Sequence, residues 1–436
     1  NTYMKKVIKK ITPEWLTLAY HYVLALVASV RYGFPSRKMI VIGVTGTKGK
    51  TSVINFVWSV LMAGGYKTGI ITTANIRIGD VEVLNHYHMT MPGRFAIQGL
   101  MAKMIKEGCK VCLVETTSEG LKQFRHIGIA YDSAVFTNLT PEHLPSHGGS
   151  FEKYKQAKGK LFAALKRHHK VINGKEIQSA IIANTDSEHA PYYLSFNADK
   201  KITFGVNSNA EYKADSIHET SHGVDFSVAG KPYSLSILGG FNVYNALPAI
   251  AIGHFLNISD EAIKKGLNNL ALIPGRMEVI QTQPYTVIVD YAHEKQSITG
   301  VLKTALAMKK PDARVIILLG AEGGGRDKAK RPIMGELAGT MADYLIVTNV
   351  DPYDDDPVEI MEDIAVVAEK FGKVRDQTMF VIEDRRAGIH QALSLARPGD
   401  IVLICCKGAE QSMIIKGESI PWDDRKVVKE ELQKIS

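Results

Sequence analysis

The stretch that most constrains the fold is GVTGTKGKTS at residues 43–52, which directly follows the apolar run 39–42. The apolar run predicts a buried strand, and apolar residues at helical spacing from Val53 to Leu61 predict a helix after the loop. A glycine-rich turn between a strand and a helix points backbone N–H groups into one concavity, at the positive end of the helix dipole. There a lysine can reach phosphate oxygens and a hydroxyl can bind Mg²⁺. We therefore expect a triphosphate-binding loop formed by Gly46, Thr47, Lys48, Gly49, Lys50, Thr51 and Ser52.

Strand and helix patterns alternate along most of the chain, which predicts α/β domains built on parallel sheets. The predicted strands are 39–44, 67–71, 111–115, 133–137, 286–290, 314–319, 344–348, 379–382 and 401–405. The predicted helices between them include 95–107, 297–308, 360–371 and 385–395.

Two changes of pattern suggest domain boundaries. Between residues 174 and 238, short strands with polar turns, such as 201–204 and 225–228, predict a smaller sheet within the first α/β system. Pro274-Gly275 is a turn signal where that system ends. We expect three parts: a short helical segment, a central ATP-binding domain with a parallel sheet and a smaller subsheet, and a C-terminal α/β domain like a dinucleotide fold. Their predicted ranges are 1–38, 39–274 and 275–436.

Composition excludes several classes of protein. With 436 residues, 45% hydrophobic and 22% charged, the chain has the make-up of a folded soluble protein. The net charge is +8, but the basic residues are scattered and no basic run interleaves with aromatics, so we expect no nucleic-acid partner. Four cysteines in so long a chain fit a reducing cytoplasm rather than a disulfide scaffold. The pairs Cys109-x-x-Cys112 and Cys405-Cys406 lack joint zinc-site spacing, and we expect core cysteines.

An apolar stretch near the N-terminus, WLTLAYHYVLALVASV at residues 15–30, has helical character. It is shorter than the roughly 20 residues of a membrane span and contains His21. We expect a helix packed on the body of the protein and no membrane association, with a membrane-surface anchor as the alternative.

Polar residues follow two of the predicted strands in the first α/β system. Glu115 ends the strand 111–115 and is followed by three hydroxyl residues. The strand 133–137 runs into a loop with one acid and two histidines, His143 and His147. Parallel sheets carry their active sites at the carboxyl ends of strands, and hard oxygen ligands with an imidazole suit Mg²⁺ beside a phosphate. Each feature alone also fits a solvated strand end or loop.

Taken together, these motifs resemble the Mur ligase family. The similarity runs from about residue 39 to the end, through TGTKGKTS, VETTSEG, FTNLTPEHLPSHG, YKQAKGKLF, GGFNVYNALPAIA, PGRMEV, VDYAHE and GGGRDKAKRPIMG. Within the family, the chain most resembles the ligases that add the third residue of the peptidoglycan stem peptide. The resemblance implies ATP and two Mg²⁺ ions as cofactors.

The resemblance also implies roles for single residues. Lys50 and Thr51 match the phosphate-loop lysine and the first Mg²⁺ ligand. Glu115 and His143 match ligands of a second Mg²⁺. Lys158 matches a lysine that is carbamylated in the family, which turns an ammonium into an anion beside that metal.

Further matches concern the nucleotide and the domain that follows the ATPase domain. Asn242 and Asn245 match asparagines that contact the nucleotide. Arg276, Asp290 and His293 match residues of the C-terminal domain that reach ATP when the domains close.

The substrates have implied contacts as well. Thr90, Ser118, Gln123 and Arg125 match positions that hold the muramoyl-peptide, and Arg326 matches an arginine that grips the α-carboxylate of the incoming amino acid.

The chain departs from the family pattern in two places. Family members usually carry a uridine-nucleotide domain before the ATPase domain, whereas about 38 residues precede it in this sequence. In the amino-acid pocket, Asp351-Pro352-Tyr353 stands where diaminopimelate-adding enzymes have Asn-Pro-Arg, so Tyr353 replaces an arginine. With Asp351, Asp355 and Glu410 nearby, the pocket favours a side chain that ends in a cation, such as lysine. The alternative is that the aspartates are a solvated cluster at a helix start.

The expected activity is therefore ATP-dependent, ADP-forming amide synthesis on a UDP-muramoyl-peptide through an acyl phosphate, as part of peptidoglycan synthesis in the cytoplasm. Two alternatives stay open: a Mur-type ligase with a non-UDP peptide or polymer acceptor, and a non-catalytic nucleotide-binding protein of the same descent. We expect a monomer whose partners are small-molecule substrates.

Overall fold

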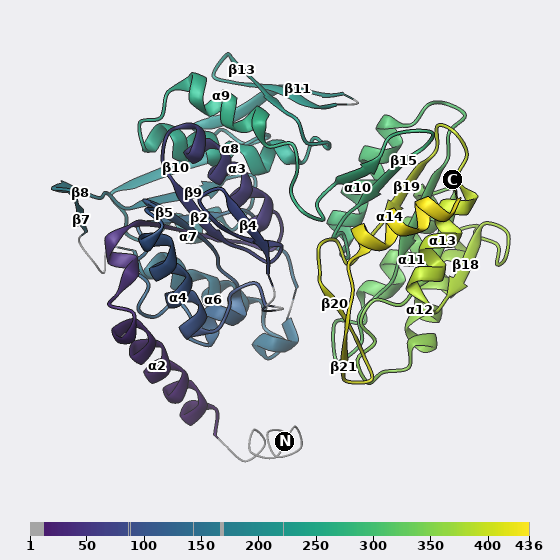
Figure 1. Ribbon diagram of the computed structural model, residues 1–436, viewed down its shortest axis with the longest axis horizontal. Coiled ribbons are helices and arrows are strands. Elements are labelled where there is room, and N and C mark those ends of the chain that lie inside the picture. Colours follow the sequence, from purple (N-terminus) through teal and green to yellow (C-terminus); the bar gives the residue numbers. More distant parts are fainter. Residues whose placement is uncertain are drawn as a thin grey trace. The chain divides into compact units, whose positions relative to one another are not determined.

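The computed structural model of the chain describes residues 13–85, 87, 89–142, 144–165, 170–220 and 222–435. It divides into two compact units. One unit contains the chain up to Lys213 together with Tyr244–Gly266, and the other contains Ala214–Val243 together with the chain from Leu267 onward. Each unit has helices packed on a sheet (Figure 1).

The first unit is built on a mainly parallel sheet. Its strands are β1 Ile40–Thr45, β2 Thr68–Ile71, β3 Asn75–Ile78, β4 Val81–Leu84, β5 Val111–Glu115, β6 Ser133–Phe136, β9 Ala180–Asn184 and β10 Lys200–Gly205. They lie in the order β10-β9-β6-β1-β5-β2-β3-β4, with β3 and β4 as an antiparallel hairpin at one edge. Because β1 pairs in parallel with both β5 and β6, the segments that follow these three strands meet at one edge of the sheet.

The helices of the first unit include α3 Lys50–Ala63, α4 Arg94–Lys106, α5 Ser118–Lys122, α6 Phe151–Ala163, α7 Ala190–Leu194, α8 Asn242–Phe255 and α9 Asp260–Asn269. Of these, α3, α4, α6 and α7 contact strands of the sheet. Met101 of α4, Phe162 of α6 and Tyr193 of α7 belong to one buried core with alternate residues of β5 and β6. Short elements complete the unit: the 3-10 turns Pro35–Lys38 and Leu144–His147 and the two-residue strands β7 Val171–Ile172 and β8 Lys175–Glu176.

The second unit has a six-stranded sheet in the order β14-β15-β19-β16-β17-β18. These strands are β14 Glu278–Gln281, β15 Thr286–Val289, β16 Val315–Leu319, β17 Tyr344–Thr348, β18 Met379–Ile382 and β19 Ile401–Ile404. β14 is antiparallel and the other neighbours pair in parallel. The meander β11 Tyr212–Thr220, β12 Gly223–Val228 and β13 Lys231–Leu235 continues the first sheet beyond β10, because β11 pairs in parallel with β10. The pair β20 Ser412–Ile415 and β21 Glu418–Pro421 forms a separate antiparallel hairpin.

Helices cover both faces of that six-stranded sheet (Figure 1). They are α10 Lys295–Met308, α11 Lys330–Met341, α12 Pro357–Lys370, α13 Arg385–Leu395 and α14 Asp424–Ile435. Within β16, Ile317 packs in the core with α10, α11 and α12, whereas its neighbours Ile316 and Leu318 pack in the core with α13 and α14. The strand is apolar throughout because both of its faces are buried.

The observed strands confirm the predicted α/β class. All nine predicted strands are present within one residue at each end, and the four predicted helices are present within three residues at each end. One detail was wrong: the predicted strand 201–204 is part of β10, which pairs in parallel with β9 and so belongs to the large sheet rather than to a separate smaller one. The sequence signal of polar turns around it does not reveal its strand partner.

The apolar N-terminal stretch forms α2, Glu14–Arg31. It contacts α4 and is buried at Ala25, Ala28 and Ser29, so it packs on the first unit as predicted. Most of its large apolar side chains nevertheless stay exposed. None of the helices in the described part of the chain combines the length and apolarity needed to cross a bilayer.

Candidate active site

The predicted phosphate loop lies between β1 and α3 and is held by the segment that follows β6. The backbone N–H of Thr47 donates to Asn138 O at 2.9 Å, and the N–H of Lys48 donates to Asn138 Oδ1 at 2.8 Å. Thr137 Oγ1 in turn donates to Lys48 O at 2.7 Å. These bonds anchor one side of the loop. The curvature of the loop depends on two glycines, Gly46 and Gly49.

Gly46 and Gly49 adopt backbone angles that favour glycine, with φ of +151° and +81°. A Cβ on Gly46 would lie 1.9 Å from Thr137 Oγ1, and a Cβ on Gly49 would lie 2.4 Å from Asn245 Oδ1. The predicted nucleotide residue Asn245 is therefore brought against the loop. Asn242, the other predicted asparagine, donates through Nδ2 to Leu238 O at 2.8 Å, which holds its amide at the start of α8.

Substituting Gly49 by alanine is expected to weaken binding of ATP by roughly 30- to 150-fold, which corresponds to about 2–3 kcal/mol. The reason is that the new methyl group displaces the Asn245 amide and strains the loop backbone. Isothermal titration calorimetry with an ATP analogue measures the change. Gly65→Ala is the matched control because its φ of +83° is nearly the same and no atom lies within 4 Å of the added Cβ. Equal affinities in the two variants would contradict this account of the loop.

Thr51 and Glu115 meet at the carboxyl edge of the sheet. Thr51 Oγ1 donates to Glu115 Oε2 at 2.8 Å, and the N–H of Thr73 donates to the same oxygen at 2.9 Å. Thr73 also bonds through its hydroxyl to Thr90 Oγ1 at 2.9 Å, which links a predicted substrate residue to this group. A hydroxyl and a carboxylate in contact are the hard oxygen donors that Mg²⁺ prefers, so these residues fit the implied metal.

The structure gives less information about the second predicted metal site. His143 lies outside the described residues. No cluster of three or more His, Cys, Asp or Glu side chains suited to a metal occurs among the residues that the structure describes.

Lys158 of α6 is buried directly behind the phosphate loop. Its side chain is 2% exposed, and Nζ donates to Gly46 O at 2.8 Å and lies 4.5 Å from the ring centre of Tyr154. Burial, reinforced by the nearby charge of Lys50, holds the pKa of Lys158 well below its usual value. A neutral amine is the form that reacts with CO₂, so this environment favours carbamylation.

Lys50 itself folds back in this structure, with Nζ donating to Thr47 O at 2.9 Å. Ser52 is buried in the first turn of α3. Lys48 pairs with Glu142 at 3.1 Å, a contact that the sequence patterns did not indicate.

The predicted muramoyl-peptide residues form two groups in the first unit. Ser118 Oγ lies 3.1 Å from Nε2 of buried His147, a histidine that the sequence placed in the loop but not in the site. Gln123 Oε1 accepts from Arg125 Nη2 at 2.7 Å, and Arg125 also donates to Met91 O. Burial lowers the pKa of Arg125, whose guanidinium is thus partly desolvated and suited to binding an anion.

In the second unit, the residues predicted to reach ATP gather around Tyr291. The Arg276 guanidinium lies 4.4 Å from the centre of the Tyr291 ring, and His293 Nδ1 lies 2.7 Å from Tyr291 O. Asp290 accepts from the N–H groups of Met277 and Ala292, both at 2.7 Å. Burial raises the pKa of Asp290, so these two donors compensate a carboxylate in an apolar setting.

Tyr291 connects this group to the predicted amino-acid pocket. Its hydroxyl donates to Glu410 Oε1 at 3.0 Å, and Lys407 Nζ bridges Glu410 Oε2 at 2.7 Å and Asp351 Oδ2 at 2.8 Å. The other oxygen of Asp351 accepts from the N–H of Ile414 at 2.7 Å. Although burial alone lowers the pKa of Lys407, Glu410 and Asp351 together raise it, which keeps the ammonium charged.

These contacts correct the expected pocket. Asp351 and Glu410 were predicted to await a substrate cation, but both are already paired with Lys407, and one ammonium between two carboxylates leaves a single negative charge in excess. Asp355 is exposed and accepts from the N–H of Gly324 at 3.1 Å. The sequence could not reveal the pairing because Asp351 and Lys407 are 56 residues apart.

Arg326 follows the glycine run 323–325 on the same side of the second unit. Burial alone lowers the pKa of Arg326, but the negative charge of Glu322 and a hydrogen bond that Arg326 donates to Tyr353 outweigh burial and raise the pKa. A Cβ on Gly324 would lie 2.7 Å from the Tyr353 ring, so the ring packs on the glycine run. Tyr353, at a φ of +55°, therefore helps to hold the loop that carries Arg326.

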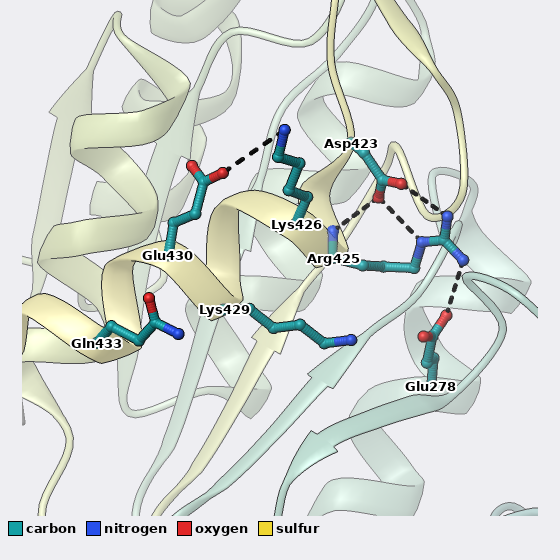
Figure 2. Close-up of a pocket in the computed structure, with 7 residues that line it drawn as sticks. All are labelled: Glu278, Asp423, Arg425, Lys426, Lys429, Glu430 and Gln433. Carbon is teal, nitrogen blue, oxygen red and sulfur yellow. Dashed lines mark hydrogen bonds and ion pairs between the residues drawn. The ribbon is translucent and has the colours of Figure 1, made fainter.

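The second unit also has a pocket whose lining includes none of the predicted site residues (Figure 2). Its volume is about 380 Å³, and its lining residues are Glu278, Asp423, Arg425, Lys426, Lys429, Glu430 and Gln433. Arg425 pairs with Asp423 at 2.7 Å and with Glu278 at 3.6 Å, and Lys426 lies 3.8 Å from Glu430. Three acidic and three basic side chains balance one another there, so the pocket has no surplus charge for an anionic substrate.

Comparison with known proteins decides the family. Residues 44–253 match the Mur ligase middle domain, and residues 275–408 match the Mur ligase glutamate ligase domain. A UDP-N-acetylmuramoyl-L-alanyl-D-glutamate–2,6-diaminopimelate ligase from Bacillus cereus is 38% identical over 415 residues, which cover 93% of this chain and 81% of the relative. The chain belongs to the Mur ligase family.

This Mur ligase has other relatives with similar coverage. A UDP-N-acetylmuramyl-tripeptide synthetase from Roseiflexus sp. is 36% identical over 413 residues, 92% of this chain and 80% of that protein. A solved structure of a UDP-N-acetylmuramoyl-L-alanyl-D-glutamate–2,6-diaminopimelate ligase is 27% identical, with a TM-score of 0.60 over 91% of this chain and 78% of that one. The resemblance found in the sequence motifs is thus confirmed, and so is the fold class.

Proposed function

We propose that this Mur ligase joins an amino acid to the carboxylate of a UDP-muramoyl-peptide, with cleavage of ATP to ADP and phosphate, in peptidoglycan precursor synthesis in the cytoplasm. The observation that carries the proposal is the grouping of the phosphate loop, the Thr51–Glu115 pair and buried Lys158 at one edge of a parallel sheet. The relatives from Bacillus cereus and Roseiflexus sp. described above are named as ligases of this kind.

The chemistry that this site supports has two steps. The substrate carboxylate attacks the γ-phosphorus of ATP, which forms an acyl phosphate and releases ADP. The amino group of the incoming amino acid then attacks the carbonyl carbon, loses a proton and displaces phosphate. Both steps build negative charge on oxygen, which cationic groups stabilise.

We assign the first-unit residues to nucleotide and metal binding. The N–H groups of the loop from Gly46 to Thr51 and the Lys50 ammonium bind phosphate oxygens, and Asn245 supports the loop. Thr51, Glu115, His143 and carbamylated Lys158 are the residues that would hold Mg²⁺. When bound, the metal would offset phosphate charge and lower the barrier to phosphoryl transfer.

The other assignments concern substrates. We assign Thr90, Ser118, Gln123 and Arg125 to the muramoyl-peptide, with His147 positioning Ser118 through the 3.1 Å contact. In the second unit we assign Asn242, Arg276, Asp290 and His293 to the nucleotide and Arg326 to the α-carboxylate of the amino acid. Asp351, Tyr353, Asp355 and Glu410 surround its side chain. The chain is assigned as a monomer with ranges 1–38, 39–274 and 275–436 as its parts.

The kcat/KM for lysine is expected to exceed that for diaminopimelate by about tenfold, which corresponds to a difference of about 1.4 kcal/mol in activation free energy. A distal carboxylate would meet a group with one excess negative charge, and the cations nearby are engaged: Lys407 by Asp351 and Glu410, and Arg331 by Asp363 at 2.9 Å. Competition between the two amines, read by mass spectrometry, measures the ratio.

Tyr353→Arg should reduce the ratio of kcat/KM for lysine to kcat/KM for diaminopimelate, because it places a cation beside the pocket. Tyr353→Phe is the control, since it keeps the ring on Gly324 and adds no charge. A wild-type preference for diaminopimelate would show that the excess charge does not set specificity. The same assay with a peptide acceptor that lacks UDP tests the alternative substrate, and absence of ADP with every acceptor would support the non-catalytic alternative.

A further inference from the structure

Helix α2 exposes a continuous stripe of large apolar side chains. Tyr20 is 61% exposed, Val23 55% and Val30 65%, and the other members of the stripe are Leu16, Leu26 and Val27. They recur at intervals of three and four residues, which places them on one face of a helix. Figure 1 shows α2 at the edge of the first unit. The exposed fractions show that the described residues of that unit leave this face of the helix uncovered.

The opposite face of α2 uses small residues to pack. Ala25, Ala28 and Ser29 are buried, and Ser29 Oγ donates to Ala25 O at 2.8 Å. An ordinary surface helix buries its large apolar residues and exposes its small or polar ones. Here the arrangement is reversed, and contiguous apolar patches of this kind mark interaction surfaces.

The charge around the stripe indicates what covers it. Among residues 13–38, three basic residues, Arg31, Arg37 and Lys38, stand against a single acid, Glu14. Arg31 lines the same hollow as Leu26, Val27 and Val30, and Arg37 and Lys38 are exposed just beyond the helix. An apolar helix face bordered by cations matches the interface of an anionic lipid layer, where apolar side chains enter the acyl boundary and cations meet the headgroups.

We infer that the apolar stripe of α2 docks this ligase onto an anionic membrane surface, with the helix lying in the plane of the interface. Its 18 residues do not meet the length and apolarity of a membrane-spanning helix. A second copy of the chain is a poorer occupant, since a two-fold contact through α2 would bring two segments of net positive charge together. The inference is independent of the ligase chemistry proposed above.

Flotation of the full chain with lipid vesicles tests the inference. One vesicle type contains phosphatidylcholine alone and the other contains 30% phosphatidylglycerol by design. The wild type is expected to float with the anionic vesicles only, and to be released by high salt. The double variant Val23→Gln/Val27→Gln should reduce the bound fraction by about tenfold, because it removes two side chains from the apolar contact.

The matched control is Val358→Gln/Val366→Gln on α12. Those valines are 49% and 43% exposed, close to the 55% and 48% of Val23 and Val27, and they also lie on a helix. The control should bind vesicles as the wild type does. Circular dichroism melts and lipid-free ligase turnover should be alike in all three proteins, so loss of binding is not loss of folding.

Three results would overturn the inference. The first is no flotation of the wild type with anionic vesicles. The second is flotation that Val23→Gln/Val27→Gln leaves intact. The third is a concentration-dependent dimer, seen by analytical ultracentrifugation, that the α2 variant abolishes without any lipid binding by the wild type. That result would assign the stripe to a second copy of the chain.

Discussion

Lys158→Ala should lower kcat by about 10³-fold, an energy near 4 kcal/mol in the transition state. The side chain lies behind the phosphate loop, with Nζ donating to Gly46 O at 2.8 Å, and its carbamate is assigned to the metal that serves phosphoryl transfer. Short carboxylates such as acetate or formate should restore part of the rate, because they supply the missing anion in the space that the side chain leaves. Steady-state turnover with and without added carboxylate measures both effects.

Lys153→Ala on the same helix is the matched control, since this lysine is exposed and should leave kcat unchanged. Mass spectrometry under native conditions adds a second readout, in which the carbamate appears as one bound CO₂ in the wild type and is missing in Lys158→Ala. Full activity in Lys158→Ala would contradict the assignment of carbamylated Lys158 to metal binding. A loss of activity that carboxylates do not rescue, with no bound CO₂ in the wild type, would make Lys158 a structural cation instead.

Asp424→Asn is expected to reduce the free energy of unfolding of the second unit by about 3–5 kcal/mol. Arg385 at the start of α13 forms two bonds to Asp424, at 2.8 and 2.6 Å, and also donates to Cys405 O at 2.7 Å. Both side chains have no exposed surface. The substitution keeps the shape but leaves a guanidinium buried without its counter-charge, and urea denaturation measures the cost.

Two further variants separate the effect of burying the Arg385 and Asp424 charges on stability from the effect of pairing them. Glu359→Gln breaks an exposed pair with Lys328 at 3.3 Å, and its unfolding midpoint should stay close to that of the wild type. The double variant Arg385→Met/Asp424→Leu removes both charges at once and should recover most of the loss from Asp424→Asn. If Asp424→Asn lowered the free energy of unfolding as little as Glu359→Gln, the Arg385–Asp424 pair would not be a main stabilising contact between α13 and α14.

The sequence predicted the elements and the phosphate loop well because their signals are local. Apolar runs define β1, β5 and β16, and glycine spacing defines the loop that Gly46 and Gly49 form. The grouping of Thr51 with Glu115 followed from one rule, that parallel strands end at a common edge.

What the sequence did not reveal depends on strand order. Asp351 follows β17 and Lys407 follows β19, with β16 between these strands, so their 2.8 Å contact requires the observed order of the sheet. The contact of Ser118 with His147 likewise joins segments that follow different strands. The exposure of the apolar face of α2 could not be predicted for another reason. Periodicity identifies an apolar stripe but does not show whether the rest of the protein covers it.

One measurement tests the central proposal most directly. The purified chain is incubated with ATP, Mg²⁺, UDP-muramoyl-dipeptide and a single amino acid, and the products are read by mass spectrometry together with ADP. The account predicts a UDP-muramoyl-tripeptide and ADP in equal amounts, with lysine as the better amine. ADP and product both missing, in a sample that binds ATP and is folded, would contradict it.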